Sequence, residues 1–146
     1  MSIDLDQIDI VVRDMDATLA FYRALGVEIP DEAIWRTATG IHHIDITMPS
    51  KLIVHFDSPR LAVAYNTGWR EPEGTGTRNL FSFKVSDRDN VDELHRRLTD
   101  LGHRSSQEPY DAFWGSRYAI VEDPDGNHIG IMSASDPSRR SAPPDI

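Results

Sequence analysis

The chain has 146 residues, a formal net charge of −9 and no cysteine. It is long enough for one domain with a hydrophobic core. The absence of cysteine excludes disulfides, thiol nucleophiles and cysteine-bound zinc, and the acidic balance argues against a nucleic-acid partner, because phosphate binding needs a basic face. We expect a cytoplasmic protein without a membrane span, since no run of about 18 apolar residues and no secretory signal is visible.

The first half of the chain alternates strand and helix patterns. Apolar residues alternate over Leu5–Val12, which predicts a strand, and Asp14 stands where a helix N-cap is expected. The helix that follows should end at Gly26, a typical C-terminal glycine. Two further strands are predicted at His42–Met48 and Lys51–Phe56, on either side of a Pro-Ser turn.

A change of composition follows, and then the pattern starts again. Ser58–Thr77 is rich in glycine and proline and reads as a long connecting loop. Asn79–Val85 predicts a strand, and Ser86 or Asp87 should cap a helix that ends near Gly102. The apolar stripe of that helix consists of Val91, Leu94, Leu98 and Leu101.

The last part of the chain reads as a hairpin followed by a tail. Arg117–Glu122 and His128–Met132 have strand patterns, and the Asp-Pro-Asp-Gly-Asn segment between them supplies the residues that a tight turn needs. Residues 133–146 are rich in serine, proline and charge with little to bury, so we expect a disordered tail.

The two halves match each other. Gln7–Asp14 lines up with Leu80–Asp87, each running from a strand into a helix cap. We therefore predict a single α+β domain over residues 1–132, built from tandem modules of one helix on a small sheet. Module one covers residues 5–57, a linker covers 58–77, and module two covers 78–132. The two sheets are expected to form a curved surface around a cleft.

Two segments carry a family resemblance. VVRDMDATLAFYRALGV and VEDPDGNHIGIM are similar to the first strand and helix and to the closing hairpin of the vicinal oxygen chelate superfamily, which includes glyoxalases, bleomycin-resistance proteins and extradiol dioxygenases. FYRALGVEIP together with EPYDAFWGSRYAIVEDPDGN resembles the mitomycin-binding resistance proteins. This resemblance implies paired βαβββ units, a homodimer, and a planar drug held between aromatic side chains. Tyr110 stands where those proteins have a ligand-stacking tryptophan.

The resemblance also indicates where a metal would be bound. In the enzymes of this superfamily the ligand positions correspond to Gln7, His55, Leu80 and Gly130. Leu80 and Gly130 cannot coordinate through their side chains, and catalytic metals usually have at least three protein ligands. We therefore expect no metal cofactor, with Gln7 and His55 as the candidates if there is one.

The histidines leave two interpretations open. His42 and His43 are adjacent, so in a strand they face opposite sides. His43 and Asp45 share one face, and His55 lies on the neighbouring strand. These residues are expected to line a solvated cleft; the alternative is an acid–base pair or an unconventional metal site. The three other histidines are expected at the surface: His95, His103 and His128.

Aromatic residues form the expected ligand site. Tyr110, Phe113 and Trp114 fall within five residues, and such a group is either core or a platform for a flat ligand. Phe113 is the one expected to be buried. Arg117 could face a ligand, although an ion pair with Glu108, Asp111 or Glu122 is the favoured interpretation. The predicted ligand-binding residues are Tyr110, Trp114, Phe113, Trp69, Trp35, His43 and His55.

Three functions remain in consideration. The favoured one is a metal-independent protein that binds and sequesters a planar, antibiotic-like small molecule as a homodimer without catalysis. The second is a metal-dependent lyase, isomerase or dioxygenase of the same superfamily. The third is a domain whose cleft has no ligand and whose connecting loop binds a partner protein.

Overall fold

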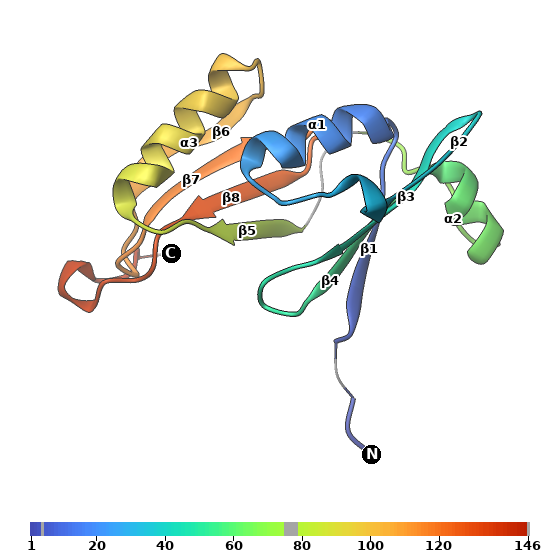
Figure 1. The fold of residues 1–146 in the computed structure, drawn as a ribbon. Coiled ribbons are helices and arrows are strands. Elements are labelled where there is room, and N and C mark those ends of the chain that lie inside the picture. Colours follow the sequence, from blue (N-terminus) through green and yellow to red (C-terminus); the bar gives the residue numbers. More distant parts are fainter. Residues whose placement is uncertain (4, 75–78, 146) are drawn as a thin grey trace. The chain divides into compact units, whose positions relative to one another are not determined.

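The computed structural model describes residues 1–3, 5–74 and 79–145 (Figure 1). The chain divides into two compact units, residues 1–74 and 75–146, which we describe one at a time. Each unit contains a four-stranded mixed sheet with a long helix packed on it. The structure confirms the α+β class and the two βαβββ modules.

The first unit has the sheet order β1-β4-β3-β2. β1 runs parallel to β4, and the other neighbours are antiparallel. β2 is a short strand that the sequence analysis did not predict, and it follows a single 3₁₀ turn, η1. The elements of this module are β1 (Gln7–Val11), α1 (Met15–Leu25), η1 (Asp31–Ala33), β2 (Ile34–Thr37), β3 (Gly40–Thr47) and β4 (Ile53–Asp57).

Helix α1 covers one face of this sheet. The Asp14 side chain accepts a hydrogen bond from the backbone N–H of Ala17 at 2.9 Å, and Gly26 ends the helix with a φ of 107°, as expected from the sequence. Tyr22 on the helix packs against Phe56 on β4, with ring centroids 4.5 Å apart. Successive residues of a strand point to opposite sides of the sheet, and Phe56 points toward α1. Its neighbours His55 and Asp57 therefore lie on the other face, which we call the open face of module one.

Part of the segment expected to be a loop is helical. Residues Pro59–Tyr65 form α2, with the Ser58 hydroxyl accepting from the N–H of Leu61 at 3.2 Å and Pro59 in the first turn. Ala62 is the buried residue of this helix. Seven residues are too few to show a 3.6-residue period, which explains why the sequence pattern did not reveal it.

The second unit repeats this arrangement with the order β5-β8-β7-β6, and β5 runs parallel to β8. Asp87, and not Ser86, caps α3 by accepting from Asn90 N–H at 2.9 Å. Leu101 is 61% exposed, so the buried stripe of the helix ends at Leu98. The elements are β5 (Leu80–Lys84), α3 (Arg88–Asp100), β6 (Ser105–Asp111), β7 (Arg117–Glu122) and β8 (His128–Met132).

The predicted closing hairpin is confirmed. The Asp123 carboxylate accepts hydrogen bonds from the N–H groups of Asp125 and Asn127 at 2.9 and 2.8 Å, and Gly126 has a φ of 80°. The expectation for His95 is wrong: this residue is buried, and its Nε2 lies 2.8 Å from the Ser105 hydroxyl. A hydrogen bond to the neighbouring strand compensates for removing the ring from water.

The segment after Ser133 was expected to be disordered, but the structure shows it in contact with the loop between β6 and β7. A 3₁₀ turn forms at Pro137–Arg139 (η2). The N–H of Asp136 donates to the carbonyl of Gly115 at 3.1 Å, and the N–H of Ser141 donates to the carbonyl of Phe113 at 2.9 Å. Disorder was expected because this segment has few apolar side chains to bury. The contacts are made by backbone groups, which the residue types do not reveal.

Among the described residues, no helix is both long enough and apolar enough to cross a membrane.

Candidate functional site

The open face of module one gathers polar side chains from three strands. The cross-strand register places Asp9 of β1 beside His55 of β4, and His55 beside Asp45 of β3. His43 lies opposite Asp57 in the same pairing. Since partners in register point to the same side of a sheet, these five residues form one cluster, of which the sequence analysis had placed only His43, Asp45 and His55 together.

Asp57 links His43 to the connecting helix α2. Its carboxylate side chain is only 1% exposed, and it lies 2.6 Å from His43 Nδ1 and 2.8 Å from the Tyr65 hydroxyl. A buried carboxylate without partners would be costly, so these two donors explain how it is accommodated. Tyr65 was not predicted as a site residue, because its helix was not recognised.

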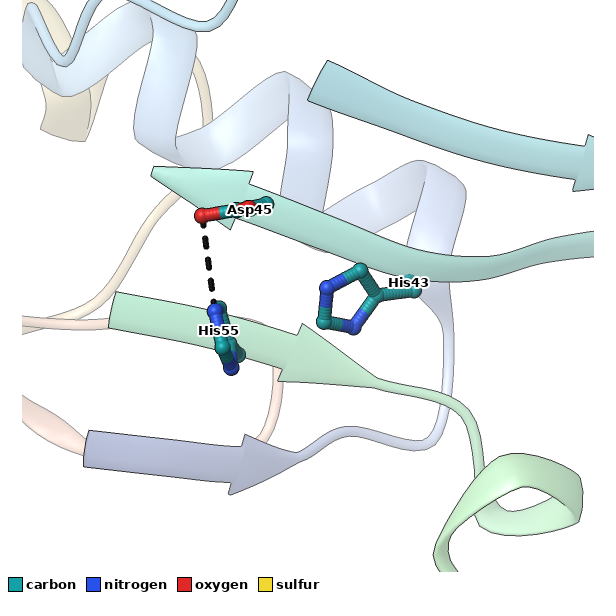
Figure 2. A group of neighbouring side chains, drawn as sticks. All are labelled: His43, Asp45 and His55. Atoms are coloured by element: carbon teal, nitrogen blue, oxygen red, sulfur yellow. Dashed lines mark ion pairs between the residues drawn. The ribbon is translucent and has the colours of Figure 1, made fainter. Parts of the chain in front are cut away.

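His55 has carboxylates near both ring nitrogens. Nδ1 lies 2.9 Å from Asp9, and Nε2 lies 3.4 Å from Asp45. The rings of His43 and His55 are 4.6 Å apart between centroids. Figure 2 shows His43 and Asp45 on one strand and His55 on the next, with all three side chains directed into the same space. One donor atom from each of the three residues lies within 4.8 Å of the others.

A pocket of about 260 Å³ opens beside this cluster. Burial raises the pKa of Tyr65 to about 12, and the hydrogen bond to Asp57 adds to the effect. Burial alone would raise the pKa of Asp9 as well, but hydrogen bonds from Gln7 and His55 outweigh it and leave that pKa below its usual value. The lining residues are Gln7, Asp9, His43, Asp57, Leu61 and Tyr65.

His42 lies on the opposite face from His43, as predicted. Its ring is buried, with Nε2 2.8 Å from the hydroxyl of Thr37 and 2.9 Å from that of Thr39. Its Nδ1 lies 3.2 Å from the Ser58 hydroxyl. These three hydroxyl partners give His42 a structural role at the end of the sheet.

The buried residues Ala119, Val121, Ile129 and Ile131 lie on one side of the second sheet, and we call the other side the open face of module two. Aromatic rings line part of this face. Tyr110 of β6 lies opposite Tyr118 of β7, with centroids 6.1 Å apart. Trp114 is 5.3 Å from Tyr118, and Phe113 is 5.2 Å from Trp114, all in edge-to-face arrangements. The structure thus brings the three predicted rings together and adds Tyr118. Its place in the predicted strand Arg117–Glu122, directly after the aromatic segment, was the available signal for it.

The burial of these rings differs from the expectation. Phe113, expected in the core, is 39% exposed, and Tyr110 is 36% exposed. Tyr118 is buried in their place. Burial raises the pKa of Tyr110, and the neighbouring Tyr118 acts in the same direction. The end of β6 and the short loop after it, which contains the buried Ala112, therefore present one ring each to solvent, Tyr110 and Phe113.

Arg117 is held by ion pairs. Its guanidinium forms two hydrogen bonds to Asp92 of α3, at 2.8 and 2.9 Å, and a third to Asp111 at 3.3 Å. Asp111 was among the expected partners, whereas Asp92 was missed because it belongs to a different element. Arg88 also pairs with Asp111 and donates to the carbonyl of Gly115 at 3.1 Å, which ties the ring-bearing loop to α3.

The two remaining predicted rings lie in the first unit. Trp35 on β2 is 51% exposed, and its ring is 5.3 Å from that of His42. Trp69 is half-buried and follows α2 in the chain. Its backbone N–H donates to the carbonyl of Asn66 at 3.0 Å. Within the described part of the chain, no ring contact or hydrogen bond joins Trp35 or Trp69 to His43 or His55.

The comparisons with known proteins fit this repeated architecture. The model of the glyoxalase/bleomycin resistance protein/dioxygenase superfamily matches residues 4–131. The chain belongs to this superfamily. No match is found among curated protein sequences.

Solved structures show the same fold at low sequence identity. A glyoxalase/bleomycin resistance protein/dioxygenase family enzyme from Burkholderia phytofirmans is 22% identical with a TM-score of 0.71, covering 90% of this chain and 98% of its own. A glyoxalase-related enzyme from Fulvimarina pelagi is 17% identical with a TM-score of 0.72, covering 90% and 88%. A lactoylglutathione lyase from Agrobacterium tumefaciens is 22% identical with a TM-score of 0.61, covering 90% and 93%. These likenesses describe the fold.

The residues at the superfamily-type metal positions do not fit a metal ion. Gln7 donates to Asp9 at 2.9 Å, and Leu80 has no donor atom. At Gly130, a Cβ would meet the Ser82 hydroxyl and would lie 2.7 Å from the hydroxyl of Tyr118. The space that a ligand side chain at this position would need is therefore filled by the tyrosine ring, and only Gln7 and His55 could supply ligands.

Proposed function

We propose that this protein binds a flat aromatic small molecule on the open face of module two and sequesters it without making or breaking a bond. The observation that supports this most directly is the group of Tyr110, Phe113, Trp114 and Tyr118, of which the first two are 36% and 39% exposed. Rings held by two strands and the short loop between them are already ordered for a ligand, so little conformational entropy is lost on binding.

The surroundings of these rings are also suited to an apolar ligand. Leu80 on β5 is 42% exposed, and the register places it on the same face as Gly130 and Tyr118. Stacking contributes about 0.5–1.5 kcal/mol per ring pair beyond the burial of apolar area. Two such contacts together with burial are sufficient for a dissociation constant in the micromolar range.

The proposal has three further parts. The ligand resembles an antibiotic, the protein acts as a homodimer, and sequestration takes place in the cytoplasm. The superfamily includes bleomycin resistance proteins, and the superfamily-type metal positions contain Leu80 and Gly130. Sedimentation of the protein with and without ligand tests the dimer.

The decisive experiment is a tryptophan-fluorescence titration of the full chain with a panel of planar quinone and anthracycline antibiotics. We expect saturable quenching, weakened at least tenfold in Tyr110→Ala and Trp114→Ala. Leu101→Ala is the matched control, because Leu101 is an exposed apolar residue away from the rings. Equal affinities in all three variants, or recovery of a chemically altered ligand, would contradict the proposal.

A further inference from the structure

Both histidines on the open face of module one have one ring nitrogen bonded to a carboxylate. His43 Nδ1 lies 2.6 Å from Asp57, and His55 Nδ1 lies 2.9 Å from Asp9. An ionised carboxylate can only accept, so in the neutral imidazole each Nδ1 carries the proton and each Nε2 has the lone pair. This is the arrangement that orients metal-binding histidines in proteins.

The two orienting carboxylates are themselves fixed. The second oxygen of Asp57 accepts from the Tyr65 hydroxyl at 2.8 Å, and the second oxygen of Asp9 accepts from the Gln7 amide at 2.9 Å. With each carboxylate bonded through both oxygens, neither imidazole can turn freely. A single acid–base pair would need only one histidine held in this way, whereas this face has two neighbouring rings with fixed lone pairs.

Asp45 supplies a third donor. Its Oδ1 is 3.4 Å from His55 Nε2, and the donor atoms of His43, Asp45 and His55 lie within 4.8 Å of one another. Two ligands of a tetrahedral ion with bonds of about 2.0–2.1 Å are separated by about 3.3 Å. The His55–Asp45 pair already has this separation, and His43 lies beside the pair on the same face (Figure 2).

The chemistry of the donors selects the class of ion. Imidazole nitrogens with one carboxylate favour zinc, cobalt, nickel or copper over magnesium and calcium, which prefer oxygen ligands. Three carboxylates, Asp9, Asp45 and Asp57, surround the two rings and attract a cation. The Asp45 side chain is 57% exposed, so the site is open to solvent and water can complete the coordination.

We propose that His43, Asp45 and His55 bind one divalent transition metal ion on the open face of module one, with Asp9 and Asp57 as positioning residues. This ligand set comes entirely from β3 and β4. It differs from the superfamily-type set of Gln7, His55, Leu80 and Gly130, with which it shares only His55. It is also independent of the ring surface on module two.

The test is a Co²⁺ titration of the tag-free, chelator-treated full chain, followed by visible absorption, with calorimetry for Zn²⁺. We expect one equivalent to bind with the d–d bands of a four- or five-coordinate ion. Asp45→Asn and His55→Ala should each weaken binding more than about hundredfold. His128→Ala is the matched control, since this half-buried histidine lies on the other module and should leave the affinity unchanged.

Two further variants distinguish this site from its alternatives. Asp57→Asn should weaken binding about tenfold to hundredfold and shift the absorption bands, because it acts through His43. Gln7→Ala should weaken binding less than tenfold, whereas a superfamily-type site would lose a ligand. Absent Co²⁺ bands, unchanged affinity in the exposed-site variant Asp45→Asn, or a hundredfold loss in Gln7→Ala would each overturn the proposal. Circular dichroism confirms that each variant is folded.

Discussion

The open faces of the two modules occupy the same positions in the same framework but carry opposite chemistry. The strand registers match His43, Asp45 and His55 of module one to Tyr118, Ile120 and Gly130 of module two. At these matched positions module one has two imidazoles and a carboxylate, whereas module two has an aromatic ring, an aliphatic side chain and a glycine. The repeated fold therefore fixes where a site lies, and the residues at a few matched positions decide what it can bind.

The difference also changes how each face is stabilised. On module one, the buried carboxylate of Asp57 requires its two hydrogen-bond donors, since an unpaired buried charge is expensive. On module two, the ring of Tyr118 requires a glycine beneath it, because Gly130 has no room for a Cβ. One face depends on complete hydrogen bonding and the other on the absence of a side chain.

The largest effect is expected from removing the carboxylate at the centre of the polar face. Asp57→Ala leaves the His43 and Tyr65 donors without their acceptor and should lower the free energy of unfolding by about 3 kcal/mol. Chemical denaturation followed by circular dichroism measures this. Asp45→Ala, which removes an exposed carboxylate from the same face, should change it by less than about 0.5 kcal/mol. Equal losses would show that Asp57 is not the structural centre of the cluster.

On the ring face, Gly130→Ala should lower the free energy of unfolding by about 1–3 kcal/mol, because the new methyl group collides with Tyr118 and Ser82. Adding Tyr118→Ala should make the two losses less than additive, since it removes part of the collision. Gly68→Ala is the control, because the nearest atom to its added Cβ lies 3.4 Å away. Strictly additive losses would contradict the close packing.

A smaller effect is expected where the modules are alike. Asp14→Ala and Asp87→Ala remove the same helix-capping contact, which measures 2.9 Å in both modules. Each should lower the free energy of unfolding by about 1 kcal/mol. A large difference between the two, measured by denaturant titration, would mean that the shared framework is less equivalent than the registers indicate.

The smallest effect on stability comes from titrating Tyr65. Its pKa of about 12 lies above the usual value of 10.0, so the protonated phenol is favoured in the folded state. Any stabilisation it provides is complete below about pH 10 and is lost as the pH rises through about 12. Absorbance at 295 nm, compared with Tyr65→Phe, should show this late transition. In Asp57→Asn the Tyr65 transition should move toward pH 10. An unchanged transition would show that the hydrogen bond to Asp57 does not raise the pKa of Tyr65.

The sequence predicted the framework well because that framework depends on local signals. Alternating apolar residues mark β1 and β8, Asp14 marks the start of α1, and the Asp-Pro-Asp-Gly-Asn turn marks the hairpin. The repeat of strand, helix and strands then fixed the α+β class. Each of these signals lies within a few residues of the element it predicts.

The parts that the sequence did not predict depend on contacts between distant segments. Tyr65 reaches Asp57 through a helix too short to show a period, and Arg117 pairs with Asp92 from another element. The exposure of Phe113 depends on how its loop is held by residues near the end of the chain. No local pattern contains this information, so the candidate sites were only partly visible before the structure.

The contact between Gly115 and the segment after Ser133 has a practical consequence. The segment after Ser133 holds the ring-bearing loop in place through three hydrogen bonds. The carbonyls of Phe113, Trp114 and Gly115 accept from Ser141, Ser135 and Asp136, respectively. A truncation before Ser135 would remove these three contacts and release the ring-bearing loop without touching any strand.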